Sequence, residues 1–505
     1  MGLRWLAVCI VIACATGSGA AGAPAAAPLR PAAARPSWEA PLFPDHGCWG
    51  VVVHTPNRGD ALKALGVQWV RLGLRWNHIE KGSKGNYDWT EADGWIKHYQ
   101  DRGLGVMGLL TLEDLCPLYE ADKENKEVVI AAIARWCGAA AARYRGRGIL
   151  WELSNEPEVF PMGGYWNDPK TYAAMARQAA RAIKRADPQA RVAALSVAWM
   201  DRDFINTALA SGLLDDGTID VLTYHGYHRR NLTPESGLEE DLGWLRQRIA
   251  RYGKGRQIIP ADSERGYAIV PFLQPKAWHS WRNMVYSESE QAAYLARHYL
   301  ESIAQGVEIA VWYKDMSGEA NFSLWYGDET DPRGLRPMGH VYRNLATLLP
   351  ENPKRLVNDR YDVSLVDLRD QNSAPDGTLT VRTYLRSYLQ RGEKQERLVI
   401  AAWNPVEAFD GRILDNRKQI GDDYYEAWRA VSPSDRVAIP VQVAISGLVP
   451  DRVKSAATYD LLARTTDEAA KPLELDTKSG RVLTPVLQVG PMPTVVVLDL
   501  AADGK

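Results

Sequence analysis

The sequence predicts an eight-stranded β/α barrel followed by an antiparallel β-sandwich, and two observations carry this prediction. Between about residues 45 and 345, short apolar segments alternate with helical ones. After the segment His340–Arg355, apolar and polar residues alternate between Gly, Asp, Asn and Pro clusters, with few helical periods. Parallel strands buried on both faces produce the first pattern, and strands with one buried face produce the second. We therefore expect a barrel over residues 41–348 and a sandwich over residues 349–505.

Eight segments are expected to form the barrel strands because each is almost continuously apolar. Pro260 departs from this pattern in the seventh, since proline cannot donate a hydrogen bond to a neighbouring strand. The segments are Trp49–His54, Trp69–Leu72, Gly105–Leu110, Gly148–Leu153, Arg191–Ser196, Ile219–Tyr224, Gln257–Ala261 and Val307–Trp312.

Helices are expected between these strands. Residues Glu127–Gly146 are rich in alanine, a strong helix former, and end on a glycine. The segment SESEQAAYLARHYLESIAQG begins with Ser287 and Glu290 at the spacing of a capping box. These signals fit the alternation that a β/α barrel requires.

The overall composition is that of a globular protein with no electrostatic reason to bind nucleic acid. The chain has 505 residues, of which 46% are apolar and 24% charged, and its formal net charge is −2. It has 18 Trp against 6 Phe. Such rings either stack on sugars or pack in the core, and the composition alone does not separate these two roles.

The N-terminus resembles an export signal. Arg4 precedes the apolar run Trp5–Ala13, which is too short to span a bilayer, so we expect a signal peptide over residues 1–21. Alternatively, VIAC, which ends at Cys14, resembles a bacterial lipobox, and Cys14 would then carry a lipid anchor. Residues 22–40 are rich in Ala and Pro and are expected to form a tether. The protein is thus expected to be secreted, periplasmic or lipid-anchored to the cell surface.

Three cysteines follow the predicted signal, namely Cys48, Cys116 and Cys137. An odd number excludes a complete disulfide framework. One bridge between Cys116 and Cys137 and a set of free buried thiols both remain open at this point.

Polar residues follow four of the predicted strands, at the end of a barrel where working residues lie. The sequence SNEPE follows the fourth strand, His225–Arg230 the sixth, Asp262–Tyr267 the seventh and Trp312–Asp315 the eighth. These segments are expected to line one cavity.

Two acidic residues in these segments, Glu156 and Glu264, suggest a catalytic pair. Glycoside hydrolysis uses one carboxylic acid to protonate the leaving oxygen and one ionised carboxylate near the anomeric carbon. Asn155 offers both a donor and an acceptor to a sugar hydroxyl. Pro157 disfavours helical geometry in the residue before it, so we expect Glu156 to be extended.

The order WELSNEP, YHGYH, DSERGY and a strand-eight aromatic resembles clan A of the glycoside hydrolases, which are retaining (β/α)8 enzymes. Within the clan, the segment Trp69–Trp89 and the helix start SEQAAYL are most similar to families 39 and 5. The resemblance covers about residues 45–345, and a trailing β-sandwich also suits family 39. Three features depart from it. Arg265 stands where the clan usually has an aromatic residue, Pro260 interrupts the strand before the nucleophile, and LLTLED (Leu109–Asp114) lacks the third-strand histidine common in family 5.

The resemblance implies a role for individual residues. Glu156 would be the general acid/base, and Glu264 the nucleophile. Asn155 would bind the 2-hydroxyl of the substrate. Arg71 would help to keep Glu264 ionised, and Tyr227 would hydrogen-bond Glu264. Trp312 would form a floor under the sugar, and Trp76 is a further candidate for contact with the substrate. His225 is either a site residue or a structural histidine.

We therefore expect an exported retaining β-glycoside hydrolase that needs no cofactor, and no His, Cys and Asp spacing resembles a zinc site. Two alternatives stay open: a transglycosylase with the same carboxylate pair, and a catalytically silent polysaccharide-binding barrel. The sugar, the linkage and the oligomeric state do not follow from the sequence. A basic active face would favour an acidic sugar, although the same charges also suit solvated loops; the residues concerned are Arg75, Arg229, Arg230, Arg265 and Lys314.

Overall fold

The structure is a computed structural model of the chain. It describes residues 40–56, 58–112, 115–159, 168–227, 233–235, 237–269, 284–285, 287–315, 322–327, 331–366, 383–404, 438–477 and 481–502. The predicted signal peptide and nearly all of the predicted tether lie outside the described residues, as do Arg229 and Arg230. No helix in the described part of the chain has the length and apolar character that a membrane span requires.

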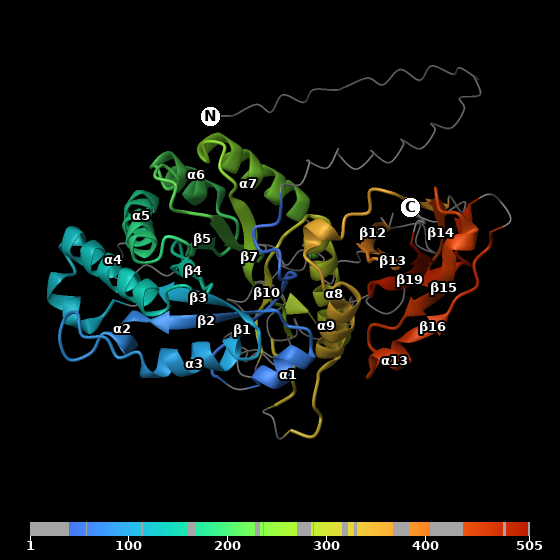
Figure 1. The fold of residues 1–505 in the computed structure, drawn as a ribbon, viewed down its shortest axis with the longest axis horizontal. Helices are drawn as coiled ribbons and strands as arrows, with labels where there is room; N and C mark the ends of the chain where they lie inside the picture. Colours follow the sequence, from blue (N-terminus) through green and yellow to red (C-terminus); the bar gives the residue numbers. More distant parts are fainter. Residues whose placement is uncertain are drawn as a thin grey trace, which may run out of the picture. The chain divides into compact units, whose positions relative to one another are not determined.

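Eight parallel strands close into a barrel in the order β1-β10-β7-β6-β5-β4-β3-β2, which confirms the predicted fold class (Figure 1). Each of the eight predicted segments overlaps one of them. Their bounds are β1 Trp49–Val53, β2 Trp69–Arg75, β3 Gly105–Thr111, β4 Leu150–Leu153, β5 Arg191–Val197, β6 Val221–His225, β7 Ile259–Arg265 and β10 Ala310–Trp312.

Helices alternate with these strands along the chain. The predicted capping box is present at α8, where the hydroxyl of Ser287 accepts a hydrogen bond from the backbone N–H of Glu290 at 3.2 Å. A short ladder pairs β8 (Ala268–Ile269) with β9 (Met284–Val285) after β7. The helices are α1 Gly59–Ala64, α2 Trp76–Ile79, α3 Thr90–Gln100, η1 Pro117–Asp122, α4 Lys126–Arg143, α5 Pro169–Ala186, α6 Arg202–Ala210, α7 Leu238–Tyr252, α8 Glu288–Ala304 and α9 Pro337–Leu348.

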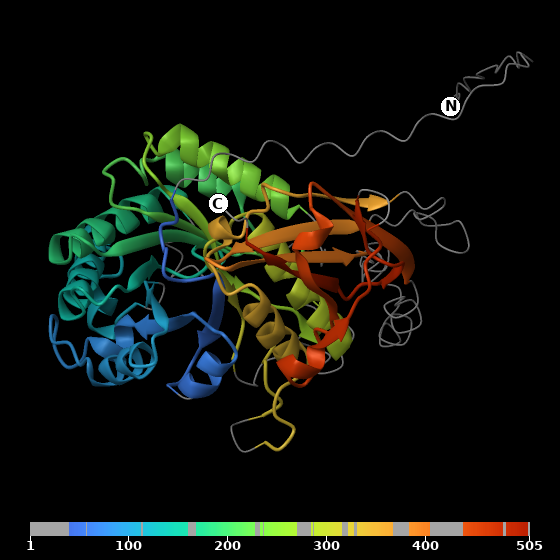
Figure 2. The ribbon, with the colours of Figure 1, turned by 45° about the vertical axis from the view of Figure 1, so that its right-hand side comes forward.

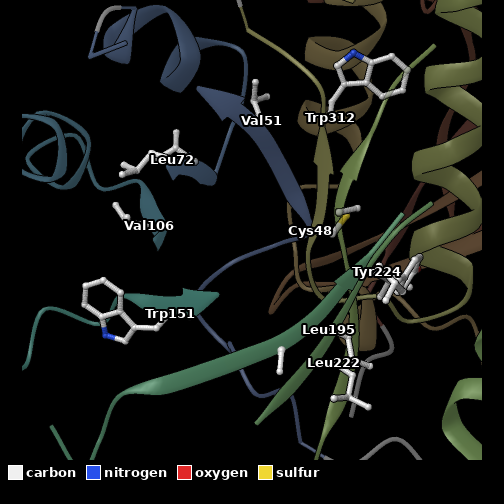
Figure 3. Packing of buried hydrophobic residues seen from close by; sticks show 14 of the residues in the cluster. Cys48, Val51, Leu72, Val106, Trp151, Leu195, Leu222, Tyr224 and Trp312 are labelled. Carbon is white, nitrogen blue, oxygen red and sulfur yellow. The ribbon is translucent and has the colours of Figure 1, made fainter. Parts of the chain in front are cut away.

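Side chains alternate between the inside and the outside of the barrel along each strand. One apolar cluster fills the interior, with residues such as Trp69, Leu150 and Val311. The outward-facing residues form a larger cluster under the helices; Figure 3 shows Val51, Leu72, Trp151, Leu222 and Trp312 among them. Membership in one cluster or the other shows which strand residues point toward the barrel axis and which point toward the helices.

The N-terminal end of the barrel is closed by the segment that precedes β1. Leu42 and Phe43 pack against the interior cluster, and the ring of Phe43 meets that of Trp69 edge-on at 5.0 Å. The backbone N–H of Phe43 donates to Glu308 Oε2 at 3.0 Å. This plug leaves the opposite, C-terminal end of the strands available for a site.

Pro260 lies within β7 without removing a bond from the ladder. In a parallel strand, the N–H groups of alternate residues point toward the same neighbour. The N–H of Asp262 donates to Ile309 O at 3.0 Å, on the side of β10, so residue 260 also faces that side. The β10 ladder begins only where Ala310 pairs with Asp262, so the missing donor of Pro260 has no ladder partner there.

The C-terminal strands form two antiparallel sheets that pack face to face, as the sequence predicts (Figure 2). Residues from both sheets, including Leu398, Ile400, Val443 and Ile445, share one core between them. The first sheet contains β12 Tyr384–Arg391, β13 Gln395–Trp403, β19 Thr494–Ala501, β15 Val453–Tyr459 and β16 Ala470–Pro472, and the second contains β11 Asp362–Val366, β14 Ile439–Ser446, β17 Val482–Leu483 and β18 Leu487–Val489.

The second face of the five-stranded sheet packs against the barrel helices. Val399 and Trp403 alternate with the sandwich-core residues and belong to the same apolar cluster as the helical layer of the barrel. The hydroxyl of Tyr388 on β12 donates to the backbone oxygen of Leu300 on α8 at 2.7 Å. The central strands β13 and β19 are therefore buried on both faces.

The three described cysteines are buried free thiols. No bridge links Cys116 to Cys137, which decides the alternative that the sequence leaves open. Burial raises the pKa of the Cys137 thiol, which disfavours the reactive thiolate.

Candidate active site

The polar residues of the barrel interior converge on Arg71, which lies on β2 with an exposed fraction of 2%. Its Nε donates to Glu152 Oε2 at 2.6 Å, its Nη1 to Glu264 Oε2 at 2.7 Å, and its Nη2 to Asn155 Oδ1 at 2.8 Å. Burial lowers the pKa of Arg71, but the carboxylates of Glu152 and Glu264 outweigh this effect, and the net pKa lies above the usual value. One guanidinium thus orients side chains from β4, its following turn and β7.

Glu264 lies near the end of β7 and accepts a hydrogen bond on each carboxylate oxygen. Arg71 donates to Oε2, and the hydroxyl of Tyr227 donates to Oε1 at 3.2 Å. Both contacts are those that the sequence resemblance implies. Donors on both oxygens fix the orientation of the carboxyl group, as an attacking group requires.

Glu156 follows β4 and contacts His225, the last residue of β6. Nδ1 of His225 lies 2.7 Å from Glu156 Oε1, and Nε2 lies 3.0 Å from Ser196 Oγ. His225 is fully buried. Burial lowers its pKa, but the carboxylates of Glu264 and Glu156 raise it more, so the net pKa lies above the usual value. The histidine therefore orients Glu156 through one ring nitrogen.

The two acidic residues lie close together across the barrel. One carboxylate oxygen of Glu156, one of Glu264 and a ring nitrogen of His225 all lie within 4.8 Å of one another. Both glutamates are partly exposed, whereas His225 is buried beneath them. A substrate that enters the C-terminal end of the barrel can therefore reach both carboxyl groups.

The backbone of Glu156 differs from the sequence-based prediction. Its φ of 46° places it in the left-handed region, so the expectation of an extended residue is wrong. A following proline favours the extended region, but this local preference is overridden at Glu156. In this left-handed conformation, the N–H of Glu156 donates to the backbone oxygen of Ser196 at 2.9 Å. The turn after β4 is thereby bonded to the end of β5.

Trp76 and Trp312, which the sequence predicts to contact substrate, both have fully buried side chains in the structure. Trp76 begins α2 and stacks on Trp136 with a centroid distance of 5.8 Å. Trp312 points outward from β10, and Nε1 donates to Phe322 O at 3.2 Å. The next residue, Tyr313, is partly exposed and packs against the interior cluster, so it is the aromatic residue of this strand end that faces the barrel interior.

Fewer of the predicted basic residues are exposed at the C-terminal end of the barrel than the sequence suggests. The guanidinium of Arg265 is fully buried and donates to the hydroxyl of Tyr267 at 2.5 Å, so it adds no exposed positive charge to this end of the barrel. Lys314 has an exposed fraction of 9%, whereas Arg75 is exposed at the end of β2. Arg265 therefore stands beside Glu264 in sequence but on the other side of the strand.

Three site residues were not identified from the sequence: Glu152, Ser196 and Tyr313. Glu152 is fully buried and contacts Arg71, and Ser196 contacts His225. The alternation of strand residues offered a signal for two of them. Glu152 lies two residues after the interior residue Leu150, and Tyr313 lies two residues after Val311, so each is expected on the interior side of its strand. Ser196 gave no such signal, because the pairing of β5 with β6 changes register between Leu195 and Val197, where Ser196 lies.

The close group of Glu156, His225 and Glu264 also has the geometry to hold a metal ion. A cationic group already lies beside two of these residues, however. Arg71 Nη1 is 2.7 Å from Glu264 Oε2, and Arg71 Nη2 is 3.4 Å from His225 Nε2. A divalent ion among these ligands would be repelled by the buried guanidinium, so the residues fit a metal poorly.

The fold is shared with solved structures of glycoside hydrolases. A family 39 glycoside hydrolase from Bacteroides cellulosilyticus WH2 aligns with a TM-score of 0.58 at 18% identity, over 89% of this chain and 80% of that one. The family 39 enzyme from Xanthomonas axonopodis pv. citri aligns with a TM-score of 0.54 at 15% identity, over 91% and 94%. A monomeric β-xylosidase from Caulobacter crescentus CB15 aligns with a TM-score of 0.52 at 15% identity, over 91% and 97%.

These alignments cover both the barrel and the C-terminal sheets and show a common architecture. No protein-family model matches the chain. A search of curated proteins likewise finds no match.

Proposed function

We propose that the chain is an exported retaining β-glycoside hydrolase with Glu264 as nucleophile and Glu156 as general acid/base. The observation that carries the proposal is the approach of one oxygen of each carboxylate to within 4.8 Å of the other. Retaining enzymes hold their two carboxyl groups about 5 to 5.5 Å apart, whereas inverting enzymes separate them by about 6.5 to 9.5 Å to admit a water molecule. The short spacing supports retention.

The reaction would proceed by double displacement. In the first step a Glu264 oxygen forms a bond to the anomeric carbon, and the glycosidic oxygen departs with the proton of Glu156. In the second step Glu156, now ionised, takes a proton from water, whose oxygen displaces Glu264 from the anomeric carbon. Both residues end in their initial protonation states, so no cofactor is consumed.

The surrounding contacts suit these roles. Arg71 and Tyr227 donate to Glu264 and keep the carboxylate oriented for attack. His225 contacts the oxygen Oε1 of Glu156, which leaves Oε2 to face the leaving group. Arg71 holds Asn155 through its Oδ1, which fixes the amide beside Glu156, where it is placed to contact the 2-hydroxyl of the sugar.

The substrate class is a β-linked oligo- or polysaccharide. Two of the structurally similar proteins are described as a β-xylosidase and a glucosidase, so β-xylosides and β-glucosides are the first substrates to test. An acidic sugar remains a second choice, because the burial of Arg265 removes one of the charges that favoured it.

Mechanism-based labelling tests the proposal. Activated 2-deoxy-2-fluoro-β-glycosides of xylose, glucose and glucuronic acid should inactivate the protein and leave one sugar on the peptide that contains Glu264, as detected by mass spectrometry. The variant Glu264→Gln should not be labelled, whereas Glu474→Ala, a change at an exposed residue of the sandwich, should be labelled like the wild type.

Two other outcomes would point to the alternatives. Sugar binding without labelling by any of the probes would favour a catalytically silent polysaccharide-binding barrel. Labelling accompanied by products longer than the substrate would favour a transglycosylase, which uses the same carboxylate pair but a different acceptor.

Export is part of the proposal and has its own test. Expression of the full chain in a bacterial host should yield a protein that begins after residue 21 and is found outside the cytoplasm. If Cys14 instead carries a lipid, the protein will fractionate with membranes, and Cys14→Ser will release it.

A further inference from the structure

Unusual backbone conformations are concentrated around the proposed acid/base. In the described part of the chain, seven residues other than glycine have a positive φ, and five of them lie in residues 154–156 and 195–200. These are Ser154 at 71°, Glu156 at 46°, Leu195 at 89°, Ser196 at 50° and Met200 at 50°. Such conformations are unfavourable for residues other than glycine and persist only where surrounding contacts hold them.

Hydrogen bonds join these two segments directly. The N–H of Glu156 donates to the backbone oxygen of Ser196 at 2.9 Å. The N–H of Ala198 donates to the side-chain oxygen Oε1 of Glu158. The first is a backbone contact that most substitutions would preserve, whereas the second depends on the side chain of Glu158.

Glu158 is well placed to act as a fixed support. Its other oxygen, Oε2, is buried and has no hydrogen-bond partner among the described residues. Burial raises the pKa of Glu158 to about 7, and the nearby carboxylate of Glu156 raises it as well. At mildly acidic pH the side chain is therefore a neutral acceptor, which a glutamine can imitate.

We propose that Glu158 is a positioning residue that holds the carboxyl group of Glu156 in place through its contact with Ala198. The inference rests on the proposed function, because it assigns Glu158 a task only if Glu156 is the acid/base. Without the contact, the left-handed turn relaxes and the carboxyl group moves away from the leaving oxygen. A displacement of about 1 Å can lower a rate by about 100-fold.

The test compares substrates whose leaving groups differ in how much they need protonation by the general acid. An aryl β-glycoside with a poor leaving group, such as phenol, requires protonation, whereas one with a good leaving group, such as 2,4-dinitrophenol, departs without it. Glu158→Ala should lower kcat/KM for the phenyl glycoside by about 10- to 100-fold and leave that for the dinitrophenyl glycoside within about 2-fold. Glu158→Gln, which keeps a carbonyl acceptor for Ala198, should retain most of the wild-type value at pH 6.

Controls separate this role from a general effect on folding. Rates are measured per active site titrated with the fluorosugar, and Glu474→Ala serves as an unaffected variant. If Glu158→Ala does not fold, Glu158→Asp provides the same measurement, because its shorter side chain should not reach Ala198 and should give the same selective loss.

Three results would overturn the inference: equal losses on both substrates, no loss on either, or a loss in Glu158→Gln as large as in Glu158→Ala. Failure of the proposed function is distinguishable, because it would appear in the wild type itself as absent hydrolysis and absent labelling of Glu264.

Discussion

Nδ1 of His225 lies 2.7 Å from Oε1 of Glu156, and Nε2 of the same buried ring lies 3.0 Å from Ser196 Oγ. The ring is thus fixed at both nitrogens. Because Glu264 and Glu156 both favour the charged imidazolium, the folded protein binds a proton at His225 more tightly than the unfolded chain does. The histidine therefore links folding stability to pH.

The first prediction concerns this link. A pKa that is raised on folding contributes stability that is fully present below the unfolded value of about 6.5 and is lost as the pH rises through the folded value. Removing the titratable ring with His225→Asn should therefore cost more free energy of unfolding at pH 5.5 than at pH 8.5. Urea denaturation at the two pH values measures the difference. An equal or larger cost at pH 8.5 would contradict the prediction.

The second prediction concerns Arg71. Arg71→Met leaves the carboxylates of Glu152 and Glu264 without their shared cation, and Glu152 is fully buried. Breaking a buried pair from one side costs about 3 to 5 kcal/mol, so urea denaturation should show a loss of that size. Activity should fall by about 100-fold or more, because Glu264 loses an orienting donor.

Glu152→Gln is the matched control for Arg71, since its amide oxygen can still accept from Arg71 Nε. We expect it to be less destabilising than Arg71→Met and to keep most of the activity. A loss below about 1 kcal/mol in Arg71→Met would mean that the three contacts of the guanidinium contribute little.

The barrel was predictable from the sequence because a parallel strand buried on both faces leaves an uninterrupted apolar run. The ends of the strands were not. β7 continues through Asp262 to Arg265, although these polar residues look like a loop in the sequence. Their polarity reflects the site at the C-terminal end of the barrel, where strand geometry persists but the side chains face a ligand cavity or neighbouring polar groups.

The candidate carboxylates were found because their residue types and positions suit one chemistry, and the structure brings them together. Which of the residues near the carboxylates face the barrel interior and which face the helices was harder to predict. Trp312 and Tyr313 are adjacent aromatics, and only the parity of Ile309 and Val311 shows that Tyr313 faces inward. The left-handed turn at Glu156 depends on a contact with Ser196, 40 residues later, which no local pattern reveals.

The third prediction separates these two aromatics. Trp312→Ala removes a fully buried ring and should destabilise the protein by about 3 to 5 kcal/mol. Tyr313→Ala should instead raise KM by about 10-fold, which corresponds to about 1.4 kcal/mol of lost binding, with a smaller loss of stability. Tyr313→Phe keeps the ring and should leave KM within about 2-fold. A rise in KM for Trp312→Ala alone would restore Trp312 as the substrate floor.

The fourth prediction concerns metal ions. Glu156, His225 and Glu264 offer ligand atoms within 4.8 Å of one another, but the guanidinium of Arg71 already supplies positive charge at Glu264. Dialysis against EDTA should therefore leave kcat/KM within about 2-fold of its initial value. Added Zn²⁺ would have to displace the hydrogen bond between His225 and Glu156 and withstand repulsion from Arg71, so micromolar Zn²⁺ should inhibit only weakly. Loss of activity in EDTA that Zn²⁺ restores would show instead that the three residues hold a working metal.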